Sequence, residues 1–155
     1  MSVETKIVAD FYARLFPWID HRREVLFCRD DGGAGANAIA DLCFYFEGAD
    51  DQFRIEFKTL KTLHNEDIIG VTTKQAATWR TPTNISPHVW IARGHDAHFL
   101  FWRHDDPAFL ANLTSGKPTS NGKHSHVKAP TTTRLTLPAT FSELLKYAQA
   151  SGLLR

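Results

Sequence analysis

The chain has 155 residues, of which 43% are apolar and 23% charged, and its formal net charge is +1. These values are typical of one soluble domain with a sizeable core, and they exclude a global basic excess that would by itself indicate a nucleic-acid partner. No leader peptide and no apolar run of membrane-spanning length is visible, and Cys28 and Cys43 lie among apolar residues, so we expect a reduced, cytoplasmic protein without a membrane partner.

The N-terminal quarter predicts a helix, a short strand and a flexible turn. Ile7, Phe11 and Leu15 recur at helical spacing within residues 3–16, and Pro17 ends the pattern. Ser2 is the expected N-cap. Residues 25–28 predict a strand, and residues 30–37 a glycine-rich turn.

That turn contains a glycine pattern with a second interpretation. Gly33, Gly35 and Ala38 match the G-x-G-x-x-A spacing of dinucleotide-binding proteins. The motif requires a helix immediately afterwards, to present backbone N–H groups to a pyrophosphate. Residues 40–46 instead alternate like a strand, so a dinucleotide site survives only if residues 36–46 are helical.

The next two segments predict a hairpin that carries charged residues. Residues 41–47 alternate as a strand and residues 48–52 form a polar turn. Residues 53–60 then alternate strictly, with Glu56 and Lys58 on the face opposite Phe57. An antiparallel return brings Asp41 to the same end as Glu56 and Lys58. Whether they share a face depends on the turn register, which the pattern leaves open.

The middle of the chain predicts one helix and two strands. Residues 59–70 are expected to be polar and irregular. Thr72 or Thr73 is expected to cap a short helix over residues 74–80, with Gln75 and Trp79 on one face. Residues 88–92 are apolar on both sides and predict a central strand, and residues 98–103 predict another.

The C-terminal third is basic. Residues 107–142 contain no acidic side chain, and we expect a mobile loop over residues 115–126. A short strand is expected over residues 134–137, and a capping box over residues 140–143 should open a closing helix. Our candidates for contacts with nucleic-acid phosphates are Lys74, Lys117, Lys123 and Lys128.

The order of these features resembles the PD-(D/E)XK nuclease superfamily, which has a restriction-endonuclease-like fold. The resemblance covers about residues 1–103, and in it Asp41 matches the metal-binding acid, Glu56 the second acid and Lys58 the motif lysine. Gln75 with Trp79 is similar to the family's Q-x-x-x-aromatic helix. One departure is the alanine, rather than proline, that precedes Asp41.

The resemblance implies an α/β fold with an αβββαβ core, in which helices flank a mixed central sheet. We expect a single nuclease-like domain over residues 1–155, with a basic loop and a C-terminal strand-helix extension over residues 104–155. It also implies a metal-dependent endonuclease that acts on DNA and leaves a 5′-phosphate. A small core of this kind is compatible with a homodimer.

The expected chemistry is hydrolysis of a phosphodiester assisted by Mg²⁺, with Mn²⁺ as a substitute. Such an ion prefers oxygen ligands, which Asp41, Glu56 and the backbone carbonyl of Phe57 can supply. Lys58 would orient or deprotonate the attacking water or stabilise developing charge, and beside two carboxylates it should stay protonated until metal binds. Gln75 would bind water or substrate. Glu4 is a further candidate ligand, because some family members place an acid on the first helix.

Three alternatives remain open from the sequence. The same fold can bind nucleic acid or a protein partner without cleaving anything. The charged residues can be structural, with Asp41 as a turn cap and Glu56 and Lys58 as a surface ion pair. His95, His98 and His104 can form a transition-metal site. A further histidine pair, at residues 124 and 126, is expected in the mobile loop.

Overall fold

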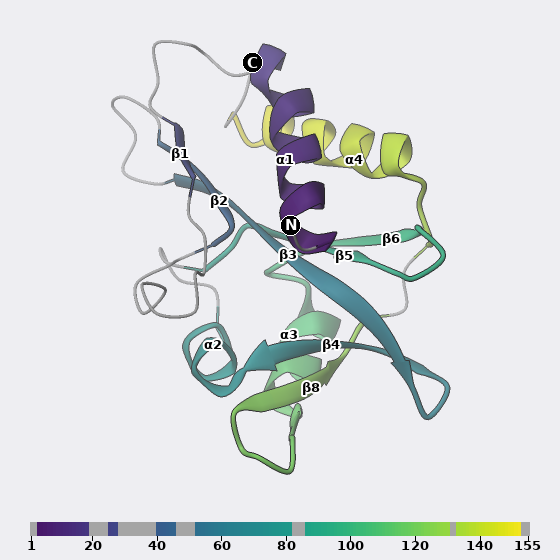
Figure 1. Ribbon diagram of the computed structural model, residues 1–155. Helices are drawn as coiled ribbons and strands as arrows, with labels where there is room; N and C mark the ends of the chain where they lie inside the picture. The colour runs from purple at the N-terminus through teal and green to yellow at the C-terminus, as the bar shows by residue number, and fades with distance from the viewer. Residues whose placement is uncertain are drawn as a thin grey trace.

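A computed structural model describes residues 3–18, 25–27, 40–45, 52–81, 86–130 and 133–152 (Figure 1). The predictions for Ser2, Cys28, the glycine-rich turn and the turn at residues 48–51 lie outside these ranges.

The first helix, α1 (Val3–Leu15), confirms the helical pattern, and a 3₁₀ turn, η1 (Phe16–Trp18), follows it. Glu4 in its first turn and Arg14 in its last complement the helix dipole. Phe11 and Leu15 are fully buried. The ring of Phe11 packs edge-on against Phe57, with ring centroids 5.3 Å apart, so this helix is fixed to the central sheet by aromatic packing.

The central sheet is mixed. Strands β1 (Val25–Phe27), β2 (Leu42–Tyr45) and β3 (Gln52–Leu63) pair antiparallel in chain order. Strand β5 (Val89–Arg93) then pairs parallel to β3, and β6 (Phe99–Arg103) antiparallel to β5. These strands confirm the predicted hairpin and the central strand. Because residues 42–45 form β2, the helix that a dinucleotide site requires is not there, and that interpretation is wrong.

A second ladder grows from the far half of β3. That strand continues to Leu63 and returns as β4 (Glu66–Thr72), which pairs with β8 (His124–Lys128), and β8 pairs with the short β7 (Lys117–Pro118). The predicted irregular segment over residues 59–70 is therefore wrong. The turn residues His64 and Asn65 both adopt positive φ, 51° and 62°, as a tight two-residue hairpin turn requires.

The polar segment escaped prediction because residues 61–66 are all exposed, so no apolar alternation marks the strands there.

The C-terminal third also differs from expectation. The expected mobile loop is instead the β7–β8 hairpin, so the histidines at 124 and 126 lie on a strand. Helix α3 (Pro107–Thr114) was not predicted; the side chain of Asp106 caps it by accepting from the N–H groups of residues 108 and 109. Proline at its first position favours the helix start.

The last helix, α4 (Leu137–Ala150), begins earlier than predicted. Thr136 is its N-cap, accepting from the N–H of Ala139, so the predicted capping box over residues 140–143 is wrong. Thr140 is buried inside the helix, where its hydroxyl donates to the Thr136 carbonyl. The expected strand over residues 134–137 is reduced to a single bridge between Leu135 and Phe99.

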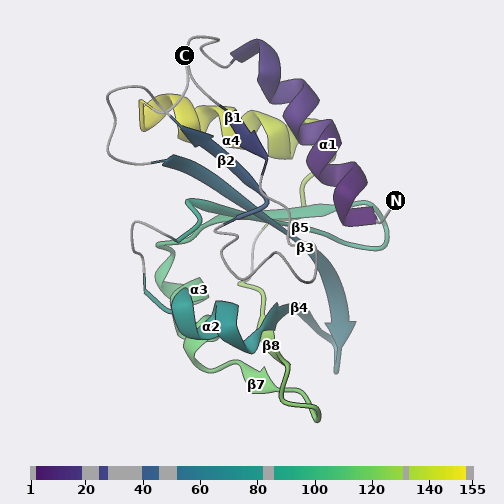
Figure 2. The same ribbon diagram turned by 60° about the vertical axis from the view of Figure 1, so that its left-hand side comes forward.

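Helices cover both faces of the central sheet (Figure 2). Helices α1 and α4 lie on one face, where a core forms around Phe11, Phe57 and Leu144. On the other face lie α2 (Thr73–Thr78) and α3, with a second core around Trp90 and Phe109. Burial of each large apolar side chain contributes roughly 1.5–3 kcal/mol. The molecule is thus a mixed α/β fold with a helix-flanked mixed sheet, as the sequence predicts.

None of the helices within the described ranges is both long and apolar enough to span a bilayer.

Candidate active site

The candidate site lies on one face of β3. Phe57 points into the core under α1 and α4, whereas Glu56 and Lys58 point to the other face. Glu56 is only 3% exposed, and the side chain of Lys58 is 13% exposed. Their ion pair, 3.0 Å between Lys58 Nζ and Glu56 Oε1, is therefore not the solvated surface pair that the structural alternative requires.

Asp41 stands opposite Glu56. The register pairs Leu42 with Ile55, so the next position along each strand places Asp41 across from Glu56. Directly opposite residues of an antiparallel pair share a face, which answers the question that the sequence left open. Asp41 Oδ2 accepts a hydrogen bond of 2.7 Å from the N–H of Phe57. The Phe57 carbonyl points to the same strand edge as this N–H, and thus toward Asp41.

Gln75 joins the pair of charged residues from α2. Its Oε1 accepts from Lys58 Nζ at 3.1 Å, and its Nε2 donates to Glu56 Oε1 at 3.4 Å. The Lys58 ammonium also lies 6.0 Å from the centre of the Trp90 ring. Gln75, Glu56 and Lys58 therefore form a closed triangle of polar contacts over an aromatic floor.

The start of α2 fixes the position of Gln75. Thr72 is the N-cap, and its hydroxyl accepts from the Gln75 N–H at 3.0 Å. In return, Gln75 Oε1 accepts from the Thr72 N–H at 3.1 Å, which completes a capping box. Because Oε1 faces two donors, Nε2 is left to face the Glu56 carboxylate. The predicted Thr72 cap and short helix are confirmed.

The site carries more negative than positive charge. Burial raises the pKa of Asp41 well above its ordinary value, and the charges of Glu56 and Glu4 raise it further. Burial also raises the pKa of Glu56, although Lys58 opposes this effect. For Lys58, burial alone would lower the pKa, but the charges of Glu56, Asp41 and Glu4 outweigh it and raise the pKa.

Glu4 acts on all three groups, so α1 contributes a third carboxylate to the same electrostatic group. Lys58 remains protonated, as the sequence predicts.

Two side chains of this region were missed from the sequence. Arg54 lies on the same strand face as Glu56, is 1% exposed, and donates from Nε to the carbonyl of Ser86 at 2.6 Å. The strict alternation of β3 could have identified it, since it precedes Glu56 by two residues. Trp90 under Lys58 was predicted only as part of a buried strand, because cross-strand neighbours depend on a register that local patterns do not specify.

The four candidate lysines do not all gather at the site. Lys74 lies on the exposed side of α2, and the Lys123 carbonyl accepts from the Thr73 N–H at 3.1 Å, so both flank the start of that helix. Lys117 and Lys128 instead line a separate pocket along β7 and β8. Lys128 pairs there with Glu66 at 2.9 Å.

The histidine metal site is not formed. His98 and His104 lie at opposite ends of β6, about 20 Å apart at the usual rise of a strand. His104 accepts a 2.8 Å hydrogen bond from the Trp90 indole, while His98 contacts Asp96 and Arg134. Across the described ranges, no three His, Cys, Asp or Glu side chains come together in a way that could hold a metal ion.

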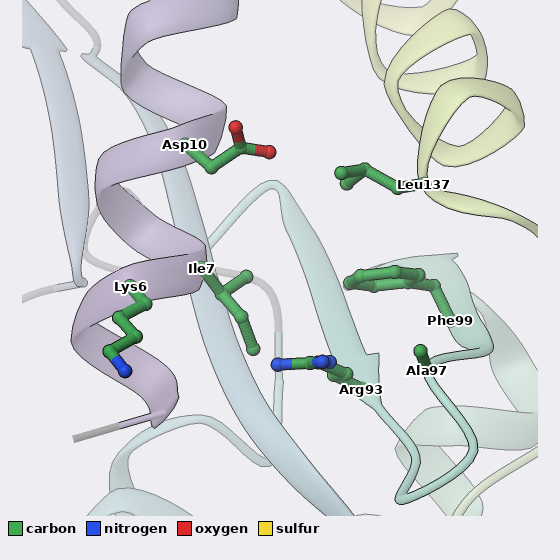
Figure 3. A pocket seen from close by; sticks show the side chains of 7 residues that line it. All are labelled: Lys6, Ile7, Asp10, Arg93, Ala97, Phe99 and Leu137. Atoms are coloured by element: carbon green, nitrogen blue, oxygen red, sulfur yellow. The ribbon is translucent and has the colours of Figure 1, made fainter.

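A cavity of about 240 Å³ lies on the α1 side of the sheet (Figure 3). It is bounded by α1, the β5–β6 hairpin and the start of α4, with Phe99 and Leu137 on its apolar side and Arg93 reaching beneath α1. None of the predicted site residues lines it, so it is separate from the group around Glu56.

Comparison with known proteins gives no match to this chain, whether with protein-family models, curated sequences or solved structures.

Proposed function

We propose that the protein is a metal-dependent nuclease that hydrolyses phosphodiester bonds of DNA. The observation that carries this proposal is the meeting of Asp41 and Glu56 on one strand face, beside the Lys58 ammonium. The order α1–β1–β2–β3–α2–β5 is compatible with the αβββαβ core of the PD-(D/E)XK superfamily, with β4 added between β3 and α2. The resemblance seen in the sequence thus agrees with the placement of its residues.

The charges of the site favour a bound divalent cation. Glu4, Asp41 and Glu56 oppose the single charge of Lys58, and the raised pKa values of Asp41 and Glu56 show that ionising both is unfavourable. A cation between these two side chains would relieve this cost. Mg²⁺ keeps several waters and uses one or two carboxylates, so Asp41, Glu56 and the Phe57 carbonyl are a sufficient protein contribution.

Bound there, Mg²⁺ or Mn²⁺ would neutralise phosphate charge and make water a better nucleophile. The protonated Lys58 is placed to stabilise the negative charge that develops on the phosphate oxygens. Gln75 holds the Lys58 ammonium in position through Oε1 and is itself held by Thr72. Glu56 Oε1 accepts from both Lys58 and Gln75, and the carboxylate also accepts a hydrogen bond from the backbone of Asp41, so a cation would bind Glu56 among these donors.

Cleavage of labelled DNA and RNA in Mg²⁺, Mn²⁺ or EDTA tests the proposal. We expect cleavage of DNA that EDTA abolishes and that Glu56→Gln and Lys58→Ala each reduce by about 10²-fold or more. The matched control replaces another acid-lysine pair, Glu143 and Lys146, whose side chains are 3.3 Å apart on the exposed side of α4. Glu143→Gln and Lys146→Ala should leave the rate unchanged.

Two results would overturn the proposal. Cleavage that persists in EDTA would exclude the metal-assisted reaction. DNA binding without cleavage in any divalent metal would instead favour the alternative of an inactive binding module.

A further inference from the structure

A second pocket lies away from the candidate active site. It has a volume of about 400 Å³ and is bounded by the β3–β4 turn, the β4 and β8 strands, Lys117 of β7 and the end of α3. None of the residues placed in the active site lines it. The proposed active site therefore does not explain the size of this pocket or the residues that line it.

One side of the pocket carries its apolar residues. Leu63 lines it and is 42% exposed, so its side chain is accessible to a ligand. Ile68 lies beside it, and the imidazole rings of His64 and His126 complete the surface. Aliphatic side chains with planar rings are suited to a flat heterocycle, and histidine is one of the side chains on which unstacked bases pack.

The rim of the pocket is cationic. Ser125 and Val127 are buried, so the residues that alternate with them on β8, including His126 and Lys128, face outward. Lys117 stands directly across from His126 in the β7–β8 register. Such a rim is complementary to a phosphate.

Glu66 is the single carboxylate among the residues that line the pocket, and its pKa responds to the positive charge of the rim. The pKa of Glu66 is lowered by the hydrogen bond and the charge of Lys128, and then by the charges of Lys117 and His64. The two lysines therefore act on one small region, and only Lys128 is paired with Glu66.

The wall contributed by α3 is polar. Asn112 and Ser115 line it at the end of that helix. An amide side chain presents both a donor and an acceptor, as the hydrogen-bonding edge of a nucleobase does. A binding site with apolar and imidazole side chains, an amide and a cationic rim thus has groups that suit the base and the phosphate of a nucleotide.

We infer that this pocket binds one unstacked nucleotide of a single strand, with the base against Leu63 and Ile68 and its phosphate on Lys117 and Lys128. The inference rests on the proposed function for its claim that the strand is the substrate. A base stacked within a duplex cannot enter such a pocket without being flipped out, so the pocket selects single-stranded DNA.

The pocket and the active site are joined by β4. Ile68 lines the pocket, and Thr72 caps the helix that holds Gln75 in the active site. The two residues are four positions apart on the strand, which is about 13 Å. Leu63 and Ile68 alternate with Leu60 and Ile69, which are buried on the Lys58 side, so the pocket opens on the opposite face of this ladder and a bound strand has to pass round the ladder to reach Lys58.

Binding is measured with the full chain carrying Glu56→Gln, so that cleavage does not interfere. We expect a labelled single strand to bind about tenfold more tightly than a duplex of the same sequence at one salt concentration. Lys117→Ala and Leu63→Ser should each weaken single-strand binding about five- to tenfold. Lys146→Ala on α4 is the matched control for charge and should change nothing.

A competition experiment separates the base from the phosphate. A nucleoside 5′-monophosphate should displace the single strand at a concentration at least tenfold below that of inorganic phosphate. Equal competition, or equal affinity for duplex and single strand, would overturn the inference.

Failure of the proposed catalysis gives a different result. The unsubstituted chain cleaving nothing in any divalent metal would overturn the proposed hydrolysis. If the same chain still prefers the single strand, and Leu63→Ser removes that preference, the proposed nucleotide pocket is supported.

Discussion

At the scale of single residues, the unusual feature of this protein is the burial of ionisable groups that face one another. Asp41, Glu56 and Lys58 lie within one small region, and the pKa values of both carboxyl groups are raised. Functional sites often retain such groups at a cost in stability. This cost in folding stability should be measurable when the charge of one side chain is removed by a substitution that keeps the shape of that side chain.

Asp41→Asn should stabilise the metal-free protein at pH 8. The pKa of Asp41 is higher in the folded chain than its ordinary value of 3.8, so the folded state favours the neutral form. The stability from this preference is present at low pH and is lost as pH rises through the raised pKa. Asparagine is always neutral and can still accept from the Phe57 N–H, so we expect a gain of about 1 kcal/mol at pH 8.

Thermal melts at pH 4 and pH 8, with and without Mg²⁺, measure this effect. The gain should shrink at pH 4, and Mg²⁺ should stabilise the unsubstituted protein but not Asp41→Asn. Asp10→Asn, on the exposed side of α1, is the control. Equal melting temperatures of Asp41→Asn and the unsubstituted chain at pH 8 would contradict the assigned cost of burying the Asp41 charge beside Glu56.

The site residues were predictable from the sequence to different degrees. Glu56 and Lys58 follow from strict alternation on β3, and Gln75 from the helix after Thr72. The proximity of Asp41 to Glu56 depends on register, which is set by the turn between the strands and not by either strand alone. Alternation on β3 places Arg54 on the same face as Glu56, but it does not show that this arginine is buried against the Ser86 carbonyl.

At the scale of elements, α2 links the local sequence to the site. Its capping box joins the backbone of Thr72 to the side chain of Gln75, and the same amide oxygen receives Lys58. A residue that begins a helix therefore also sets the orientation of a polar group in the site. Thr72 is a positioning residue in this sense.

Thr72→Ala should reduce both stability and cleavage. Loss of the N-cap costs about 1 kcal/mol. Gln75 also loses the hydroxyl that holds its backbone, so Lys58 is less well positioned, and we expect cleavage to fall about tenfold. Thr72→Ser keeps the hydroxyl and should restore both quantities.

Urea unfolding and the DNA cleavage rate report the two effects independently. Thr136→Ala, which removes the cap of α4, is matched in chemistry but lies at another helix. It should lower stability without a comparable loss of rate. Equal loss of rate in both variants would assign Thr72 a structural role only.

Elements were predictable where apolar residues mark one face. Helix α1, strands β2 and β3, and the central strand β5 all show such a pattern. Strand β4 and the β7–β8 hairpin begin in polar, exposed residues, so their pairing is visible only when the neighbouring strand is in place. Helix α3 was not predicted, although an aspartate followed by proline at its start is a recognised signal for a helix N-terminus.

At the scale of the molecule, two cores lie on opposite faces of one sheet, and the second contains a buried histidine. His104 is 2% exposed and accepts a hydrogen bond from Trp90 within the core that also holds Phe109. Burial lowers the pKa of His104 to about 4. This core includes Trp90, whose ring lies 6.0 Å from the Lys58 ammonium, so unfolding of the core at acid pH would also disturb the position of Lys58.

The protein should lose stability as pH falls from 6.5 to about 4. The folded state favours the neutral ring of His104, whose ordinary pKa is 6.5, so the stability is present above that value and is lost as pH falls toward the lowered pKa. The loss from this group amounts to at most about 3 kcal/mol.

His104→Gln cannot titrate in this range. The difference in unfolding free energy between pH 7.5 and pH 4.5 should therefore be smaller in this variant than in the unsubstituted chain. His124→Gln, on the exposed side of β8, is the control and should leave the difference unchanged. An unaltered pH dependence in His104→Gln would place the acid sensitivity elsewhere.

Strand β3 is shared between the two ladders, with its first half in the central sheet and its second half paired with β4. Glu56 and Lys58 lie where the strand passes from one ladder to the other. The ladder formed by the second half of β3 with β4 is continuous with the central sheet through the β3 backbone, so it cannot move as an independent body. Any tilt of this ladder must twist the strand that carries Glu56 and Lys58. Ligand binding to this ladder and the alignment of Glu56 and Lys58 are thereby mechanically coupled.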